Sequence, residues 1–200
     1  MTTQDIGTLS KYFVDDAAFS NLYPYSIQKL DALHWSPLAV TCKAVQFLVQ
    51  DEVVNILDIG SGNGKFCVAG AYYRPGAHYY GVEQRLHLVE QANVVRDRLG
   101  LNNVHFIHSN FTQLDLKLYD HFYFYNSFFE NLSGTDRIDD SIAYSRELYN
   151  YYCLYLCKQL EQMPAGTRIV TYCSWGDEIP RSYKVVATLF DSLLKCWIKQ

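Results

Sequence analysis

A glycine-rich segment is the strongest chemical signal in this sequence. It reads NILDIGSGNGK, from Asn55 to Lys65, and an apolar stretch runs directly into Gly60, Gly62 and Gly64. Glycine permits a tight turn and lets a ligand approach the backbone where a side chain would exclude it. A helix that begins near Lys65 would add free N–H groups for polar ligand atoms. The segment predicts a nucleotide-type site, although its third glycine comes one residue earlier than in the G-x-G-x-x-G pattern of dinucleotide-binding folds.

Acceptor groups follow at the places where a bound nucleoside would need them. In the segment HYYGVEQ, Glu83 stands at the end of the second predicted strand, about 20 residues beyond the glycines, where a carboxylate can accept hydrogen bonds from ribose hydroxyls. We assign its neighbour Gln84 to the same site. In HSNF, Asn110 can accept a bond from the exocyclic amine of adenine, and Phe111 can pack on the ring. The alternatives are a solvated Glu83 at a helix start and a turn role for Asn110.

A third group of polar and aromatic residues stands in FYNSFFENL. Asn126 follows an apolar stretch, and its amide oxygen can orient an amine, while Phe128 and Phe129 can form aromatic walls beside a cation. Glu130 can bind a cationic acceptor or take its proton. A plain loop carboxylate is the alternative for Glu130. We predict that Asn126 and Glu130 are the catalytic residues.

The elements that must position these residues alternate between strands and helices. Short apolar stretches predict buried strands, and stretches with apolar residues at helical spacing predict helices over Leu86–Leu99 and Ser141–Gln162. The strands are expected at 53–59, 78–82, 104–108, 120–125 and 168–173. The alternation around Asp191-Ser192 predicts an antiparallel hairpin over Tyr183–Lys199. This order predicts an α/β sandwich with a mostly parallel sheet and an antiparallel edge.

The N-terminal part, from Leu9 to Gln50, reads as interrupted helices, with breaks at Pro24 and at His34–Pro37. Trp35 can close over a ligand, and Thr41 can contact it from the following helix. Ordinary packing is the alternative for Trp35.

Composition limits the class of protein. The chain has 200 residues, of which 49% are hydrophobic and 19% charged, enough for one domain with a large core. The net charge of -4 disfavours a nucleic-acid partner. The six cysteines show no C-x-x-C spacing, so no metal site is expected. The start, MTTQDIG, lacks the features of a signal peptide, and no apolar stretch is long enough for a membrane span, so the chain is expected to be cytoplasmic with no membrane partner.

The ordered motifs from Asn55 to Lys199 resemble those of the class I, Rossmann-like S-adenosylmethionine-dependent methyltransferases. The resemblance implies a seven-stranded sheet of order 3-2-1-4-5-7-6, with residues 51–200 as the methyltransferase domain and residues 1–50 as a helical segment that lids the cofactor site. It also assigns the ribose to Glu83, and the adenine to Asn110, where the family commonly has Asp. The methionine part of S-adenosylmethionine would be surrounded by Asp58, Gly60, Ser61, Gly62 and Gly64.

The segment after Asn126 resembles a degenerate N-P-P-[YF] motif, without its prolines, and the asparagine-and-phenylalanine segment of non-SET protein-lysine methyltransferases. The resemblance implies methyl transfer to a nitrogen of a protein side chain, lysine-like, or of a small molecule. Two alternatives stay open. One is a catalytically inactive cofactor-binding partner protein. The other is an NAD(P)-dependent oxidoreductase, although neither Tyr151 nor Tyr155 has the lysine four positions later that such enzymes use.

Overall fold

A computed structural model of the chain describes residues 9–30, 34–50 and 53–200. Its sheet has seven strands in the order β3-β2-β1-β4-β5-β7-β6, as the family resemblance implied. The first five strands are parallel to one another, and β7 and β6 are antiparallel, so the predicted mostly parallel sheet with a closing hairpin is confirmed. The strands are β1 (Asn55–Ile59), β2 (His78–Glu83), β3 (Val104–His108), β4 (His121–Tyr125), β5 (Arg168–Tyr172), β6 (Tyr183–Leu189) and β7 (Leu194–Lys199).

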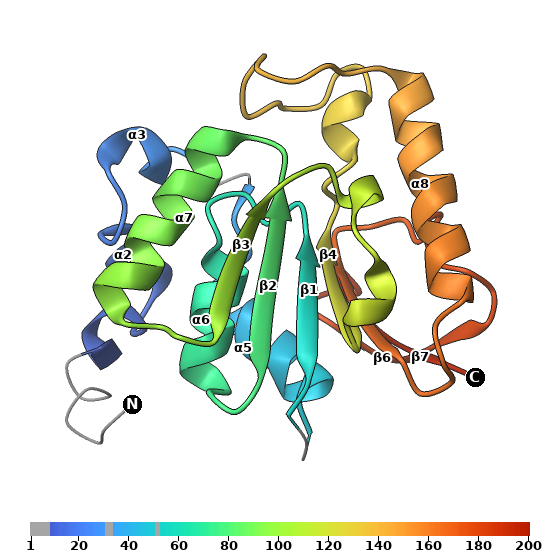
Figure 1. Ribbon diagram of the computed structural model, residues 1–200, viewed down its shortest axis with the longest axis horizontal. Coiled ribbons are helices and arrows are strands. Elements are labelled where there is room, and N and C mark those ends of the chain that lie inside the picture. Colours follow the sequence, from blue (N-terminus) through green and yellow to red (C-terminus); the bar gives the residue numbers. More distant parts are fainter. Residues whose placement is uncertain (1–8, 31–33, 51–52) are drawn as a thin grey trace.

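Helices cover both faces of the sheet, and Figure 1 shows α7 and α8 on opposite sides of it. The longer helices are α5 (Leu38–Leu48), α6 (Lys65–Tyr73), α7 (Leu86–Leu99) and α8 (Arg146–Glu161). Shorter turns are η1 (Ser10–Tyr12), α2 (Asp16–Ser20), α3 (Tyr25–Gln28), η2 (Phe111–Gln113), η3 (Leu116–Leu118) and η4 (Phe129–Asn131). None of the helices in these ranges is long and apolar enough to cross a membrane.

Two hydrophobic cores result, one on each face. The first joins the N-terminal helices with α5, α6 and α7, and the second packs α8, η2 and η3 against β1, β4 and β5. Strand residues alternate between them, since Tyr79 is buried in the first core and Val82 in the second. Each of the parallel strands β1 and β4 is covered on both sides, which explains their almost continuous apolar sequences.

Two predicted boundaries have clear physical causes. Gly100 ends α7 in the left-handed conformation, with φ of +64°, as its position after Leu99 predicted. The prediction that the last long helix starts at Ser141 is wrong by five residues. Ser145 is the N-cap of α8, because its hydroxyl accepts a hydrogen bond from the backbone N–H of Leu148 at 3.1 Å.

The hairpin leaves β6 at the edge of the sheet. Both faces of β6 are exposed after Tyr183, including Val185 and Val186. Val185 pairs with Trp197, and Ala187 pairs with Cys196, so Val186 is an extra residue that forms a β-bulge.

Candidate functional site

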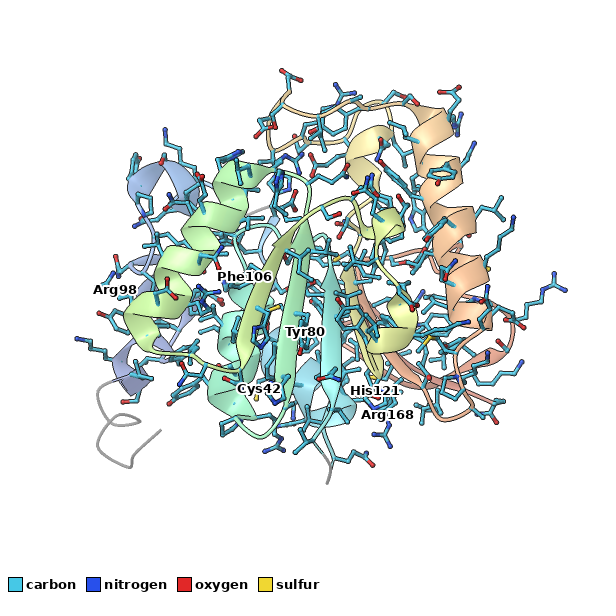
Figure 2. The ribbon with its side chains drawn as sticks, viewed as in Figure 1. Cys42, Tyr80, Arg98, Phe106, His121 and Arg168 are labelled. Carbon is cyan, nitrogen blue, oxygen red and sulfur yellow. The ribbon has the colours of Figure 1, made fainter. Side chains whose placement is uncertain are left out.

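A cavity of about 290 Å³ opens at the carboxyl ends of β1, β2 and β4. These ends meet at one edge because the strands are parallel, which is where open α/β sheets bind ligands. We call this cavity the crevice. The residues predicted for the site that line it are Gly60, Gly62, Glu83, Gln84, Phe111, Asn126, Phe128, Phe129 and Glu130. The labelled His121 and Arg168 in Figure 2 lie at the opposite edge, where β4 and β5 begin.

Glycine is favoured at all three positions of the loop after β1, and two of the three are also closely packed. All three have positive φ, +77° at Gly60, +54° at Gly62 and +84° at Gly64. A Cβ on Gly60 would overlap the side chain of Ser127, and one on Gly64 would overlap the ring of Phe106, which is labelled in Figure 2. A Cβ on Gly62 would meet open space. The loop is therefore packed at both ends and open to a ligand in its middle.

Glu83 lies at the end of β2 with its carboxylate in the crevice wall. Its side chain is only 5% exposed. One oxygen accepts a hydrogen bond from the backbone N–H of Gly62 at 3.1 Å, and the other accepts one from the backbone N–H of Arg85 at 2.9 Å. These two donors fix the carboxylate beside the open part of the glycine loop, the position that a ribose-binding acid needs.

Asp58 of β1 and Ser61 of the loop are not among the residues that line the crevice. Asp58 is buried and accepts a hydrogen bond from the Cys67 thiol at 3.9 Å. Burial, reinforced by the nearby charge of Glu83, raises the pKa of Asp58 well above its ordinary value. The hydroxyl of Ser61 is turned toward Gly81 of β2, where a Cβ would overlap it.

The two residues predicted for adenine differ in their placement. Phe111 lines the crevice and is stacked on Phe128, with ring centroids 5.2 Å apart. Asn110 is held by protein groups. Its amide nitrogen donates to Gln84 Oε1 at 3.0 Å and to the Tyr152 hydroxyl at 2.8 Å. Its carbonyl oxygen accepts from the backbone N–H of Thr112 at 3.0 Å and so caps η2.

The acceptor side of the crevice begins at Asn126. This residue has a positive φ of +32°, and in the ranges that the structure describes its side-chain amide has no hydrogen-bond partner. Cys173 follows β5 with a φ of +52°. Tyr125 of β4 pairs with Tyr172 of β5. Asn126 and Cys173, which follow these two tyrosines, are therefore neighbours at the carboxyl ends of the two strands. Such strain in residues other than glycine is concentrated at functional sites. No sequence pattern indicated this conformation of Cys173.

Glu130 is part of a hydrogen-bonded network that sequence reasoning missed. Its Oε2 atom accepts from Arg85 Nη2 at 2.5 Å, from the backbone N–H of Ile138 at 3.1 Å and from the Tyr144 hydroxyl at 3.1 Å. Arg85 is only 4% exposed and also contacts Asp139, with 3.2 Å between Nε and Oδ1. An arginine two residues after Glu83 was the available sequence signal.

The N-terminal segment contributes His34 to the crevice, which sequence analysis had treated only as part of a helix break. Burial lowers the pKa of His34. Trp35 is buried and does not line the crevice. Its ring packs against Tyr23 at 5.0 Å and lies 5.1 Å from the Lys65 ammonium nitrogen. Thr41 is fully buried, and its hydroxyl has no hydrogen-bond partner in the described ranges. Trp35 and Thr41 therefore support the wall of the N-terminal segment from behind.

Comparisons with known proteins agree with this geometry. Residues 50–128 match the family model of a methyltransferase domain. Magnesium protoporphyrin IX methyltransferase from Synechocystis PCC 6803, solved with bound S-adenosylmethionine, superposes with a TM-score of 0.59 over 100% of this chain and 99% of its own, at 16% identity. An RNA methyltransferase from Salinibacter ruber, solved with S-adenosylhomocysteine, has a TM-score of 0.55 at 18% identity, over 82% of this chain and 92% of its own.

The sheet order and the crevice define a class I, Rossmann-like methyltransferase fold. The match of residues 50–128 to the methyltransferase-domain model agrees with this fold, and the chain is similar in both respects to methyltransferases of that class.

Curated relatives correct the predicted choice of partner. A tRNA (guanine-N(7)-)-methyltransferase from Synechococcus sp. (strain JA-3-3Ab) is 54% identical over 54 residues, which are 27% of this chain and 23% of the relative. A second, from Microcystis aeruginosa, is 44% identical over 54 residues. The chain thus matches about a quarter of the length of these relatives. These relatives contradict the expectation that a nucleic-acid acceptor is less favoured than a protein or a small molecule. That expectation relied on net charge, which describes the whole chain and says little about one binding surface.

Proposed function

We propose that this protein is an S-adenosylmethionine-dependent methyltransferase that methylates a nitrogen of a nucleobase in RNA. The observation that carries the cofactor assignment is the pairing of Glu83 with Gly62. This pair sets a buried carboxylate beside an open glycine backbone at the carboxyl edge of the sheet.

The residues present fit S-adenosylmethionine part by part. Glu83 would accept hydrogen bonds from the ribose hydroxyls, and Gln84 and Phe111 would border the adenine. The open backbone at Gly62 leaves room for the methionine part, with the buried carboxylate of Asp58 beneath it. In this arrangement Asn110 acts through Gln84, whose side chain it holds. The glycine loop is shaped by Ser61 and Gly64, and the N-terminal segment beside it is packed by the buried Trp35 and Thr41.

When bound, S-adenosylmethionine supplies a methyl group on a positively charged sulfur. In the transfer, the lone pair of the acceptor nitrogen forms the new N–C bond. The S–C bond breaks, and its electron pair stays on sulfur to give S-adenosylhomocysteine. Such a displacement needs alignment more than acid or base catalysis. The Asn126 amide, which has no hydrogen-bond partner in the part of the chain that the structure describes, would hold the acceptor nitrogen in line, and the carboxylate of Glu130 would accept hydrogen bonds from N–H groups of the acceptor.

Two observations support an RNA base as the acceptor. The curated relatives are named as tRNA guanine-N7-methyltransferases. Phe129, which is half-buried and lines the crevice, also packs against Trp175, with ring centroids 4.6 Å apart, and Trp175 is 64% exposed. Exposed aromatic rings stack on unpaired bases of any sequence, typically with about 1–3 kcal/mol per base.

The test is transfer of a tritiated methyl group from S-adenosylmethionine to three separated fractions, namely unfractionated tRNA, total protein and small metabolites. Label should enter the tRNA fraction, disappear after ribonuclease treatment and co-migrate with a methylated base after digestion. The Gly62→Arg variant is the control without a cofactor site. Label in protein alone would overturn the RNA acceptor. A purified protein that binds no S-adenosylhomocysteine would overturn the cofactor assignment as well.

A further inference from the structure

The segment between η4 and α8 passes over the carboxyl edge of the sheet in Figure 1. We call residues 132–145 the strap. Thr135, Asp136, Ile138 and Tyr144 of the strap line the crevice opposite the glycine loop. The strap therefore forms a wall of the site, although it contains neither a helix nor a strand.

The buried side chain of Arg85 carries most of the polar contacts between the strap and the cofactor half of the site, and His87 adds one to Asp139, with 3.4 Å between Nε2 and Oδ2. The guanidinium of Arg85 donates from Nε to Asp139 Oδ1 at 3.2 Å and from Nη2 to the Tyr144 hydroxyl at 2.5 Å. The same Nη2 donates to Glu130 at 2.5 Å, and Nη1 lies 3.4 Å from Glu83 Oε1. Arg85 thus contacts the ribose acid, the acceptor-side carboxylate and the strap at once.

The charges in this cluster make Arg85 difficult to replace. Three carboxylates, those of Glu83, Glu130 and Asp139, surround a single guanidinium that is 4% exposed. Buried charges of this kind persist only when they are paired and hydrogen-bonded. The planar guanidinium of arginine donates hydrogen bonds to several partners in a fixed geometry, which the ammonium group of lysine does not do. If Arg85 were displaced, Glu130 and the strap would lose a common anchor.

We propose that Arg85 is a positioning residue that couples cofactor binding at Glu83 to closure of the strap over the crevice. The inference rests on the proposed function, because it takes Glu83 as the contact for the ribose. A ribose bound to Glu83 restrains that carboxylate, and through it the backbone and side chain of Arg85. The strap then docks on a guanidinium that is already ordered. By linkage, a strap that is held in place must favour the cofactor to the same degree.

Asp139 tests the coupling without touching the crevice, since it is not among the residues that line it. Asp139→Asn keeps the shape of the side chain and removes the charge that faces Arg85. We expect this variant to bind S-adenosylhomocysteine about fivefold or more weakly by calorimetry, within the usual range of coupling between sites. Asp140→Asn is the matched control. Its side chain is 93% exposed and lies 4.0 Å from its ionic partner Arg137, so its affinity should equal that of the unaltered protein.

Amide hydrogen exchange supplies a readout that loss of a structural contact would not reproduce. S-adenosylhomocysteine should slow exchange in residues 132–145 of the unaltered protein, and Arg85→Lys should abolish this response while α7 remains protected. If Arg85→Lys does not fold, Asp139→Asn takes its place in the same measurement. Unchanged affinity in Asp139→Asn, or strap exchange that is indifferent to the ligand, would overturn the coupling and leave the proposed function standing. Failure of the unaltered protein to bind S-adenosylhomocysteine would remove both.

Discussion

The backbone of Gly60 is packed directly against the side chain of Ser127. The Ser127 hydroxyl donates to the carbonyl oxygen of Ile59 at 2.6 Å, so the loop after β4 is fastened to the loop after β1. Cofactor side and acceptor side are thereby joined at the bottom of the crevice as well as through Arg85.

Gly60→Ala should destabilise the protein by about 2 to 5 kcal/mol. The new Cβ would overlap Ser127, and the positive φ of +77° is unfavourable for alanine. Gly62→Ala is the matched control, since it meets open space and carries only the backbone cost of about 1–2 kcal/mol. Urea denaturation of the two variants measures the difference. Equal losses in both would mean that Ser127 moves aside freely.

Gly62→Arg should abolish binding of S-adenosylhomocysteine while leaving the fold intact. The arginine side chain would occupy the open space above Gly62 that the methionine part is proposed to fill. Gly166→Arg is the control, because Gly166 has a similar positive φ of +87°, open space around it and a position in the turn before β5. Calorimetric titration compares the two. Binding by Gly62→Arg with ordinary affinity would show that the ligand lies elsewhere.

Asn126→Ala should slow methyl transfer about 10- to 100-fold and change S-adenosylhomocysteine affinity little, because the amide is proposed to align the acceptor. Alanine also strains the backbone at a φ of +32°, and Asn126→Gly removes the amide without that strain. Both variants should therefore be equally slow in initial-rate assays on the labelled RNA acceptor. Full activity in Asn126→Gly would remove the residue from the reaction.

Asp58→Asn should raise the melting temperature at neutral pH. Since burial and Glu83 raise the pKa of Asp58 in the folded protein, its contribution to stability is fully present below the ordinary carboxyl pKa. That contribution is lost as the pH rises through the raised value. Asparagine stays neutral, so the gain over the unaltered protein should grow with pH across about pH 4 to 8. Scanning calorimetry across this range measures it, with Asp191→Asn in the exposed hairpin turn as control. A gain that is the same at every pH would contradict the raised pKa.

The sequence predicted the scaffold well because the scaffold depends on local patterns. Short apolar strands, the positive-φ glycines and the Gly100 cap all follow from periodicity and backbone freedom, and the sheet order followed from the family resemblance. Glu83 was placed correctly at the crevice for the same reason, since the carboxyl ends of parallel strands must meet.

The residues that sequence analysis missed are those fixed by tertiary contacts. His34 is one of them, since it lines the crevice although nothing in the local sequence distinguishes it from an ordinary residue of the helix break. Residues 141–145 of the strap were assigned to the last long helix because they are compatible with helical spacing. The strap is instead held by Arg85, which lies more than fifty residues earlier, and no window-based pattern can register such a partner.

The bulge at Val186 has a consequence for the behaviour of the protein in concentrated solution. An apolar edge strand with exposed N–H and C=O groups is a template for addition of a strand from another molecule. The extra residue breaks the regular spacing of those groups and increases the local twist, so a flat incoming strand finds no continuous register. The single extra residue Val186 thus helps β6 to remain an edge strand without a further strand paired to it, and protects the molecule against fibrous self-association.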